Sequence, residues 1–289
     1  MTHALVLGAS GLVGGHVVQG LVARGCAVRC AGRRPREGWV RFDLTDPATF
    51  GPALAGVDRV FLVARPGDDA PQVVAAPLIE AMARAGVAHV VNLSAMGAEL
   101  RPEFGLRKAE LLLEASGMAF THLRPNWFMQ VFTVPPLGPL LAATGTLALP
   151  AGDARLSFVD ARDVADVAVA ALLEERLRGT GLTLTGPEAL DHEAAVREIA
   201  RATGRPFRYH AQTDDEARAA LSRSFDPARV ERLVGFYRLV RAGACAPVTS
   251  DVERATGRPA RRFAPFCDEH RAAWYPPHAS APVDATMGT

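Results

Sequence analysis

Short apolar runs alternate with stretches of helical periodicity along the first part of the chain. Between the apolar runs, hydrophobic residues recur every three or four positions, as they do at 12–22 and 71–85 and in a segment that ends near 116–117. Such alternation predicts a parallel sheet with helices on both faces. The expected strands are 4–7, 27–31, 40–43, 57–63, 89–94 and 120–123, with a short helix at 47–54.

The pattern changes after Pro125. Prolines 135, 136 and 139 cannot continue a helix or a central strand, so 126–149 is expected to be a loop-rich excursion. A strand at 156–159 and a helix from 163 are expected to rejoin the sheet. A strand at 182–185 and helices near 191–202, 214–222 and 226–242 are expected to form a second unit.

These patterns predict an α/β protein, a doubly wound parallel sheet with a smaller, mostly helical C-terminal domain. The expected first domain comprises 1–125 and 150–178, and the second comprises 126–149 and 179–275. Residues 276–289 contain prolines and small residues but no aromatic residue, so a flexible tail is expected there.

Three glycines separate the first apolar run from the first helical stretch. Gly8, Gly11 and Gly14 stand three residues apart. In a strand–turn–helix unit the first glycine permits a sharp turn, the second lets a phosphate approach the backbone, and the third lets helix and strand pack closely. Amides at the helix start then face the phosphates. The motif predicts a Rossmann-type dinucleotide site, with a merely structural turn as the alternative. Its residues are Gly8, Ser10, Gly11, Leu12, Val13 and Gly14.

The end of the second strand indicates which dinucleotide binds. Proteins that prefer the unphosphorylated cofactor usually carry a carboxylate about 20 residues beyond the glycines, where it binds the ribose hydroxyls. No acid occurs between Gly15 and Arg36, and Arg33 and Arg34 follow the strand instead. Two guanidiniums there can bind a 2′-phosphate and stack on adenine. The sequence therefore favours NADP(H), with a solvated arginine-rich loop as the alternative.

Other candidates follow from the ends of the remaining strands. Ligands of doubly wound sheets bind at the carboxyl ends of the strands, which places Asp43, Ala64, Ser94 and Arg124 around the cofactor. The cofactor site is expected to include Asp43, Leu44, Ala64 and Arg65.

Composition narrows the choice of partners. The chain has 289 residues, of which 49% are hydrophobic and 22% charged, as in a globular protein with a full dinucleotide-binding domain and a smaller second one. A net charge of +1 gives no reason to expect nucleic acid or an anionic membrane as a partner. We see no leader peptide and no bilayer-spanning run, so a cytoplasmic protein is expected. The four cysteines are too scattered for a disulfide framework or a zinc site, and no metal is expected.

Five segments in order resemble the NmrA-like branch of the atypical short-chain dehydrogenase/reductase superfamily, which includes quinone and imine reductases. The resemblance covers about 3–275, and its part at 121–129 is similar to ergot-alkaloid-type reductases. It implies that Asp43 lies near the adenine. It also implies that a substrate pocket is bordered by Asn126, Trp127, Phe128 and Met129. The five segments are 8–14, 43–46, 110–129, 158–165 and 184–187.

The usual proton donor of short-chain dehydrogenases is missing. Those enzymes use Tyr-x-x-x-Lys, in which the phenol protonates the carbonyl oxygen as hydride arrives. In the family pattern these two positions fall at Pro102 and Leu106, and the only lysine, Lys108, is two residues out of register. That offset turns a helical side chain by about 200°, away from the cofactor. Ser94 alone matches the third member of the catalytic triad.

Several candidates also have structural interpretations. Ser94 can donate a hydrogen bond to an acceptor oxygen, or it can cap the turn after its strand. Trp127, Phe128 and Met129 can form an apolar wall against a flat substrate, or they can be core residues between domains. His122 lies within a strand and is expected to be a core residue.

The resemblance and the missing acid together favour one function. If hydride reaches a quinone, a conjugated ketone or an iminium ion, the product charge is delocalised or cancelled, so a dedicated acid matters less. We therefore expect an NADPH-dependent reductase of a small, electron-poor cyclic or aromatic compound of secondary metabolism, acting as a monomer or homodimer. A non-catalytic NADP-binding redox sensor, and an isomerase or cyclase that uses the cofactor structurally, are the alternatives.

Overall fold

The computed structural model describes residues 2–34, 36–65, 68 and 70–275, which form two compact units. Unit 1 comprises Met1–Asn126, Ala161–Thr185 and Thr249–Ala260. Unit 2 comprises Trp127–Asp160, Gly186–Val248 and the described residues from Arg261 on. The tail expected at 276–289 lies outside the described residues.

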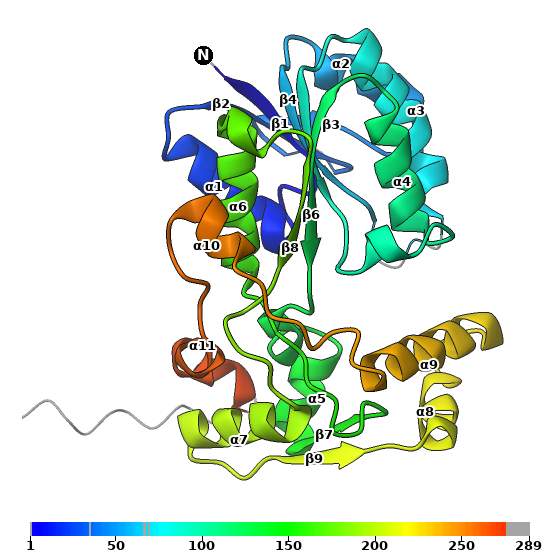
Figure 1. Cartoon of the computed structure of the whole chain (residues 1–289), viewed down its shortest axis with the longest axis vertical. Helices are drawn as coiled ribbons and strands as arrows, with labels where there is room; N and C mark the ends of the chain where they lie inside the picture. Colours follow the sequence, from blue (N-terminus) through cyan, green and yellow to red (C-terminus); the bar gives the residue numbers. More distant parts are fainter. Residues whose placement is uncertain (1, 35, 66–67, 69, 276–289) are drawn as a thin grey trace, which may run out of the picture. The chain divides into compact units, whose positions relative to one another are not determined.

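Unit 1 contains a seven-stranded sheet in which every neighbouring pair is parallel (Figure 1). The strand order is β3-β2-β1-β4-β5-β6-β8, so the chain reverses its direction across the sheet between β1 and β4. This confirms the doubly wound α/β fold. The strands are β1 (His3–Val6), β2 (Ala27–Gly32), β3 (Trp39–Arg41), β4 (Arg59–Val63), β5 (His89–Leu93), β6 (Ala119–Pro125) and β8 (Thr180–Leu184).

Helices cover both faces of this sheet (Figure 1). On one face lie α1 (Leu12–Val22), α6 (Ala161–Leu173) and α10 (Asp251–Thr256). On the other lie α2 (Phe50–Leu54), α3 (Pro71–Arg84) and α4 (Gly105–Glu114). Short 3-10 turns occur at Pro47–Thr49, Ala98–Leu100 and Glu175–Leu177. The middle positions of the central strands are apolar because both faces of the sheet are covered: Val60, Phe61, Val90 and Val91 are all 0% exposed.

The boundaries between the units differ from those expected. The strand expected at 182–185 in the second domain is β8, which pairs with β6 from Thr121↔Thr180 to Pro125↔Leu184 and so extends the main sheet. Residues 249–260 also return to unit 1. The stretch 156–159 belongs to unit 2, where it forms only isolated bridges, Phe128 with Val159 and Leu156 with Leu190. Local patterning identifies a strand but not the neighbour with which it pairs.

Unit 2 is mostly helical. Its helices are α5 (Leu137–Thr144), α7 (His192–Thr203), α8 (Asp214–Leu221), α9 (Pro227–Arg241) and α11 (Phe263–Glu269), with 3-10 turns at Met129–Phe132 and Arg271–Trp274. Strands β7 (Thr146–Leu149) and β9 (Arg208–Ala211) form a small parallel pair. The excursion at 126–149 is therefore more ordered than expected. No helix in the described part of the chain is long and apolar enough to cross a membrane.

A buried histidine in unit 2 is expected to make the folded protein less stable at acidic pH. His192 is 1% exposed and stacks on Tyr209 with ring centroids 5.4 Å apart. Burial lowers the pKa of His192 from about 6.5 to about 4. The unfolded chain therefore binds a proton that the native state excludes, and stability falls as the pH drops from 6.5 towards 4.

The variant His192→Phe is expected to reduce this acid sensitivity. One histidine contributes a loss of about 3 kcal/mol between pH 6.5 and pH 4, at about 1.4 kcal/mol per pKa unit. Denaturant unfolding at pH 7 and pH 4.5 measures the loss, with His210→Gln, an exposed histidine, as the control. Equal pH dependence in the wild type and in His192→Phe would show that His192 does not contribute.

Candidate functional site

The glycine turn after β1 forms a cradle that no side chain can enter. Gly8 has a φ of +67°, and a Cβ built there would lie 2.8 Å from Val63 Cγ1 on β4. A Cβ on Gly14 would lie 2.2 Å from the carbonyl oxygen of Gly8, and one on Gly11 would lie 3.1 Å from the same atom. Gly8 and Gly14 therefore bring the backbone of the turn against β4 and the first turn of α1.

Helix α1 begins at this cradle with amides that no side chain caps. Gly11 is its N-cap residue, is extended and provides no capping side chain, and the first turn contains no acidic residue. Ser10 and Leu12 are exposed beside it, whereas Val13 is buried. An uncapped helix start with a positive dipole end is suited to an anion. The residues present therefore fit a dinucleotide pyrophosphate.

Positive charge gathers around Asp43, two residues beyond β3. Its Oδ1 accepts hydrogen bonds from the Thr45 amide at 2.9 Å and the Thr45 hydroxyl at 2.7 Å. These bonds, together with the nearby charges of Arg33 and Arg65, hold the pKa of Asp43 below its ordinary value. Three strand ends thus bring Arg33, Asp43 and Arg65 together. Arg33 and the exposed Arg34 make no hydrogen bond or ion pair within the described part of the chain, so both guanidiniums can bind an anion.

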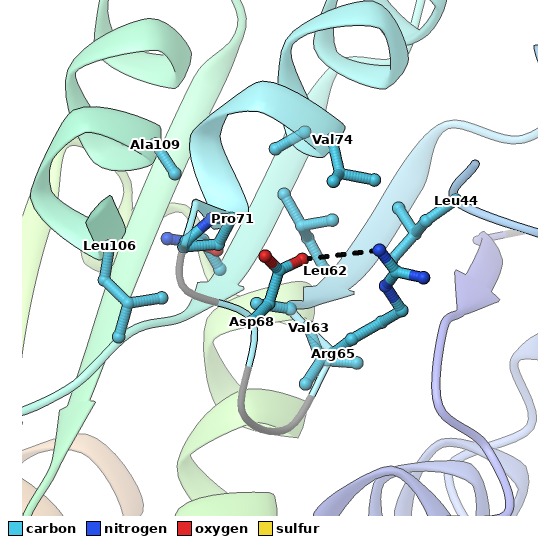
Figure 2. A pocket seen from close by; sticks show the side chains of 12 residues that line it. Leu44, Leu62, Val63, Arg65, Asp68, Pro71, Val74, Leu106 and Ala109 are labelled. Atoms are coloured by element: carbon cyan, nitrogen blue, oxygen red, sulfur yellow. Dashed lines mark ion pairs between the residues drawn. The ribbon is translucent and has the colours of Figure 1, made fainter. Parts of the chain in front are cut away.

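A narrow pocket opens at the carboxyl end of β4, between α3 and α4 (Figure 2). Leu44, Ala64 and Arg65 line it, so the structure brings these three predicted residues together. Arg65 pairs with Asp68 at 3.6 Å, as Figure 2 shows. The sequence did not identify several other lining residues, Leu62, Val63, Asp68, Pro71, Val74, Ala75, Asn92, Leu106 and Ala109.

The position that carries lysine in ordinary short-chain dehydrogenases faces this pocket. Leu106, at the start of α4, lines the pocket together with Ala109, three residues further on. Lys108 is exposed and does not line it. Two phenols are also engaged elsewhere: the Tyr209 hydroxyl donates to Leu149 O at 2.9 Å, and the Tyr275 hydroxyl donates to Thr203 O at 2.7 Å. Neither member of the Tyr/Lys pair is therefore supplied here.

Ser94, one residue beyond β5, faces a buried ionic network. Its side chain is buried and lies beside the carboxylate of Glu110, although its hydroxyl forms no well-aligned hydrogen bond within the described residues. Glu110 is 0% exposed; Arg124 donates to both of its oxygens, at 3.0 and 2.9 Å, and Arg107 donates at 2.9 Å. Burial opposes ionisation of Glu110, but its contacts with Arg124, Ser94, His122 and Arg107 hold its pKa below the ordinary value. This environment favours a structural role for Ser94, and its catalytic role stays a prediction.

Replacement of Glu110 by glutamine is expected to destabilise the protein by about 3 kcal/mol, because removing one partner of a buried ion pair leaves charge uncompensated. Arg124 would keep its charge at 12% side-chain exposure, with the longer contact to Glu99 at 3.4 Å in place of its two bonds to Glu110. Urea unfolding measures the loss. The control Glu80→Gln removes one partner of an exposed pair with Arg84 and should change stability by less than about 1 kcal/mol. Equal stabilities of Glu110→Gln and the control would contradict the prediction.

The predicted substrate segment spans the end of unit 1 and the start of unit 2. Asn126 is buried, and its amide donates to Leu184 O at 2.9 Å. Trp127 and Phe128 are half-buried, whereas Met129 is 1% exposed and packs in the core of unit 2. For Met129 this position fits the core interpretation. The roles of Asn126, Trp127 and Phe128 in substrate binding stay predictions.

Comparisons with known proteins agree with this geometry. The model of an NAD(P)H-binding family matches residues 8–175. The chain is 36% identical to a (4-alkanoyl-5-oxo-2,5-dihydrofuran-3-yl)methyl phosphate reductase of Streptomyces griseus, over 94% of this chain and 99% of that protein. It is 33% identical to an NAD(P)H azoreductase of Xenophilus azovorans, over 93% and 98%.

Solved structures share the fold. A quinone oxidoreductase of Escherichia coli, solved with NADPH, superposes with a TM-score of 0.81 at 21% identity, over 93% of this chain and 99% of that one. NmrA, a negative transcriptional regulator solved with NAD, gives a TM-score of 0.73 at 15% identity, over 93% and 94%. The predicted resemblance is confirmed. The chain belongs to the NAD(P)H-binding family, and its named reductase relatives place it among the oxidoreductases of that family.

Proposed function

We propose that the protein is an NADPH-dependent reductase of a small, electron-poor cyclic or aromatic compound, such as a polyketide-type ketone, a quinone or an imine. The observation that carries this proposal is the position of Leu106. This leucine lines the pocket where the family pattern places a lysine, so the protein handles a reduction without the usual acid pair.

The cofactor-binding residues act mainly by binding and orientation. The amides at the start of α1 and the cradle of Gly8, Gly11 and Gly14 bind the pyrophosphate, and Arg33 and Arg34 bind the 2′-phosphate. Ser10, Leu12 and Val13 line the same turn, and Asp43, Leu44, Ala64 and Arg65 surround the adenosine. When bound, the nicotinamide would supply a hydride, which is one proton together with two electrons, to the acceptor.

Without a Tyr/Lys pair, the protein is expected to reduce best those acceptors that need little help from a general acid. A general acid contributes about 10²–10⁴ to a rate, or about 3–5 kcal/mol of barrier. An acceptor that spreads the incoming negative charge over a conjugated ring, or that begins as a cation, needs less of this help. Water or a hydroxyl of the substrate then supplies the proton. Positioning of the acceptor remains the main contribution of the protein, with Asn126, Trp127 and Phe128 bordering the substrate.

The names of the relatives support this class of acceptor. The Xenophilus protein is named an azoreductase, and the Streptomyces protein a reductase of a ring-containing furanyl phosphate. The second name describes a ring whose double bond is conjugated with carbonyl groups, and the first describes an N=N double bond that accepts hydride.

The direct test follows NADPH absorbance with three acceptor classes: a quinone, a cyclic imine and a polycyclic aryl ketone. We expect NADPH consumption with at least one class and formation of an equal amount of reduced product. Binding of NADPH without consumption in any class would favour a redox sensor. Conversion of the substrate at constant absorbance would favour an isomerase that uses the cofactor structurally.

A further inference from the structure

Two aromatic side chains of unit 2 form a partly exposed stack. The rings of Trp127 and Phe236 have centroids 5.7 Å apart and planes inclined by 14°. Trp127 is half-buried and Phe236 is 39% exposed. We call this pair the aromatic platform.

The platform begins close in sequence to a strand end of the main sheet. Trp127 is two residues beyond Pro125, the last residue of β6, so its Cα lies within about 7 Å of that strand end. Ligands of doubly wound sheets bind at the carboxyl ends of the strands. Hydrogen bonds hold the Trp127 segment in unit 2, because the Val159 amide donates to Trp127 O at 2.9 Å and the Met129 amide donates to Val159 O at 2.9 Å.

The packing of α9 does not require an aromatic residue at 236. The buried residues of this helix recur every three or four positions, at Val230, Val234, Tyr237 and Val240. Phe236 is turned by about 100° from Tyr237 and by about 40° from Val240, so it lies at the edge of that buried stripe. Tyr237 meanwhile packs against the indole of Trp127 with centroids 5.8 Å apart. Tyr237 therefore joins Trp127 to the core, whereas Phe236 adds aromatic surface.

The two rings of the aromatic platform are offset from each other. Nearly parallel rings whose centroids are 5.7 Å apart are offset rather than directly face to face, and Phe236, which is 39% exposed, is the ring of the pair that is open to solvent. A flat conjugated ring can extend such a stack, and the larger the fused system, the more of the platform it covers.

We propose that Phe236 is a specificity-determining residue, and that the aromatic platform stacks against the flat rings of the substrate and favours fused-ring acceptors over single-ring acceptors. This inference rests on the proposed reductase function. It adds a residue of α9 to the substrate segment that begins at Asn126.

The test compares a fused-ring quinone, 9,10-phenanthrenequinone, with a single-ring quinone, duroquinone. Calorimetry measures the Kd of each for the protein saturated with NADP⁺, where no reduction takes place, and NADPH oxidation gives KM and kcat. For Phe236→Ala we expect Kd and KM for phenanthrenequinone to rise about tenfold, and those for duroquinone to rise less than about threefold, because a stacked ring contributes about 1–3 kcal/mol.

Matched variants separate stacking from bulk. Phe236→Leu keeps the apolar volume without the ring and should lose as much as Phe236→Ala, whereas Phe236→Tyr should behave as the wild type. Leu140→Ala, which trims an apolar side chain of α5 that is 54% exposed, should leave both quinones unaffected.

Each outcome decides the proposal. Unchanged constants in Phe236→Ala, or equal changes for the two quinones, would overturn it. If the wild type oxidises NADPH with neither quinone, the reductase function fails for this acceptor class, and the calorimetric Kd values still decide whether the platform binds fused rings.

Discussion

Replacement of Gly14 by alanine is expected to weaken dinucleotide binding by about 100-fold or more. The new Cβ would lie 2.2 Å from the carbonyl oxygen of Gly8 and 2.7 Å from its carbonyl carbon, and both are backbone atoms that cannot rotate away. The first turn of α1 would have to move away from the glycine turn, and the amides proposed to bind the pyrophosphate would be displaced. Overpacking of this kind costs about 3 kcal/mol or more, which corresponds to a loss of affinity of about 100-fold. Calorimetric titration with NADPH measures this loss.

The next residue provides the matched control. A Cβ on Gly15 would lie 3.5 Å from Ala9 O, which is an ordinary contact, and alanine favours helix more than glycine does. Gly15→Ala should therefore bind NADPH normally and unfold at the same or a higher urea concentration. Tight NADPH binding by Gly14→Ala would refute the close-approach argument.

The double replacement of Arg33 and Arg34 by alanine is expected to remove the preference for the phosphorylated cofactor. A hydrogen bond between ionised groups contributes about 1.5–3 kcal/mol, so the loss of two should raise the Kd of NADPH by about 100-fold or more. Binding of NADH should change by less than about threefold, because NADH has no 2′-phosphate. Titrations with NADPH and NADH in parallel measure the ratio of the two affinities.

Arg84→Ala controls for the loss of positive charge, because Arg84 is 71% exposed and lies at the end of α3. It should leave both affinities unchanged. The salt dependence gives a second readout, since fewer phosphate contacts flatten the decline of NADPH affinity with ionic strength. If NADPH and NADH affinities fall equally in the double variant, the two arginines do not bind the 2′-phosphate.

Much of the fold was predictable from local patterns. Strands β1, β4 and β5 are short, mostly apolar runs covered on both faces. Such a run is recognisable as a buried strand whichever strands lie beside it. The glycine cradle was predictable for a similar reason, because the close approach of Gly14 and Gly11 to the carbonyl oxygen of Gly8 lies within seven residues of chain. The contact of Gly8 with Val63 on β4 depends on the tertiary structure. The helices α7, α8 and α9 also match their periodic segments closely.

Other features depend on residues far apart in the chain. The addition of β8 to the sheet depends on its pairing with β6, about sixty residues earlier, and apolar periodicity does not encode that choice. The environment of Ser94 could not be predicted from local patterns either. Ser94 follows strand β5, whereas the Glu110 carboxylate that faces it comes from helix α4 and is surrounded by Arg107 and Arg124.

The sequence by itself determined the doubly wound sheet, the glycine turn and the absence of a Tyr/Lys pair, because each depends on short-range sterics or on which residues are present. Only the tertiary structure decided that Leu106 faces the pocket, that Arg33 and Arg65 meet at Asp43, and that Phe236 stacks on Trp127. These arrangements join side chains from separate strands and helices, and the packing of the whole chain sets the distances between them.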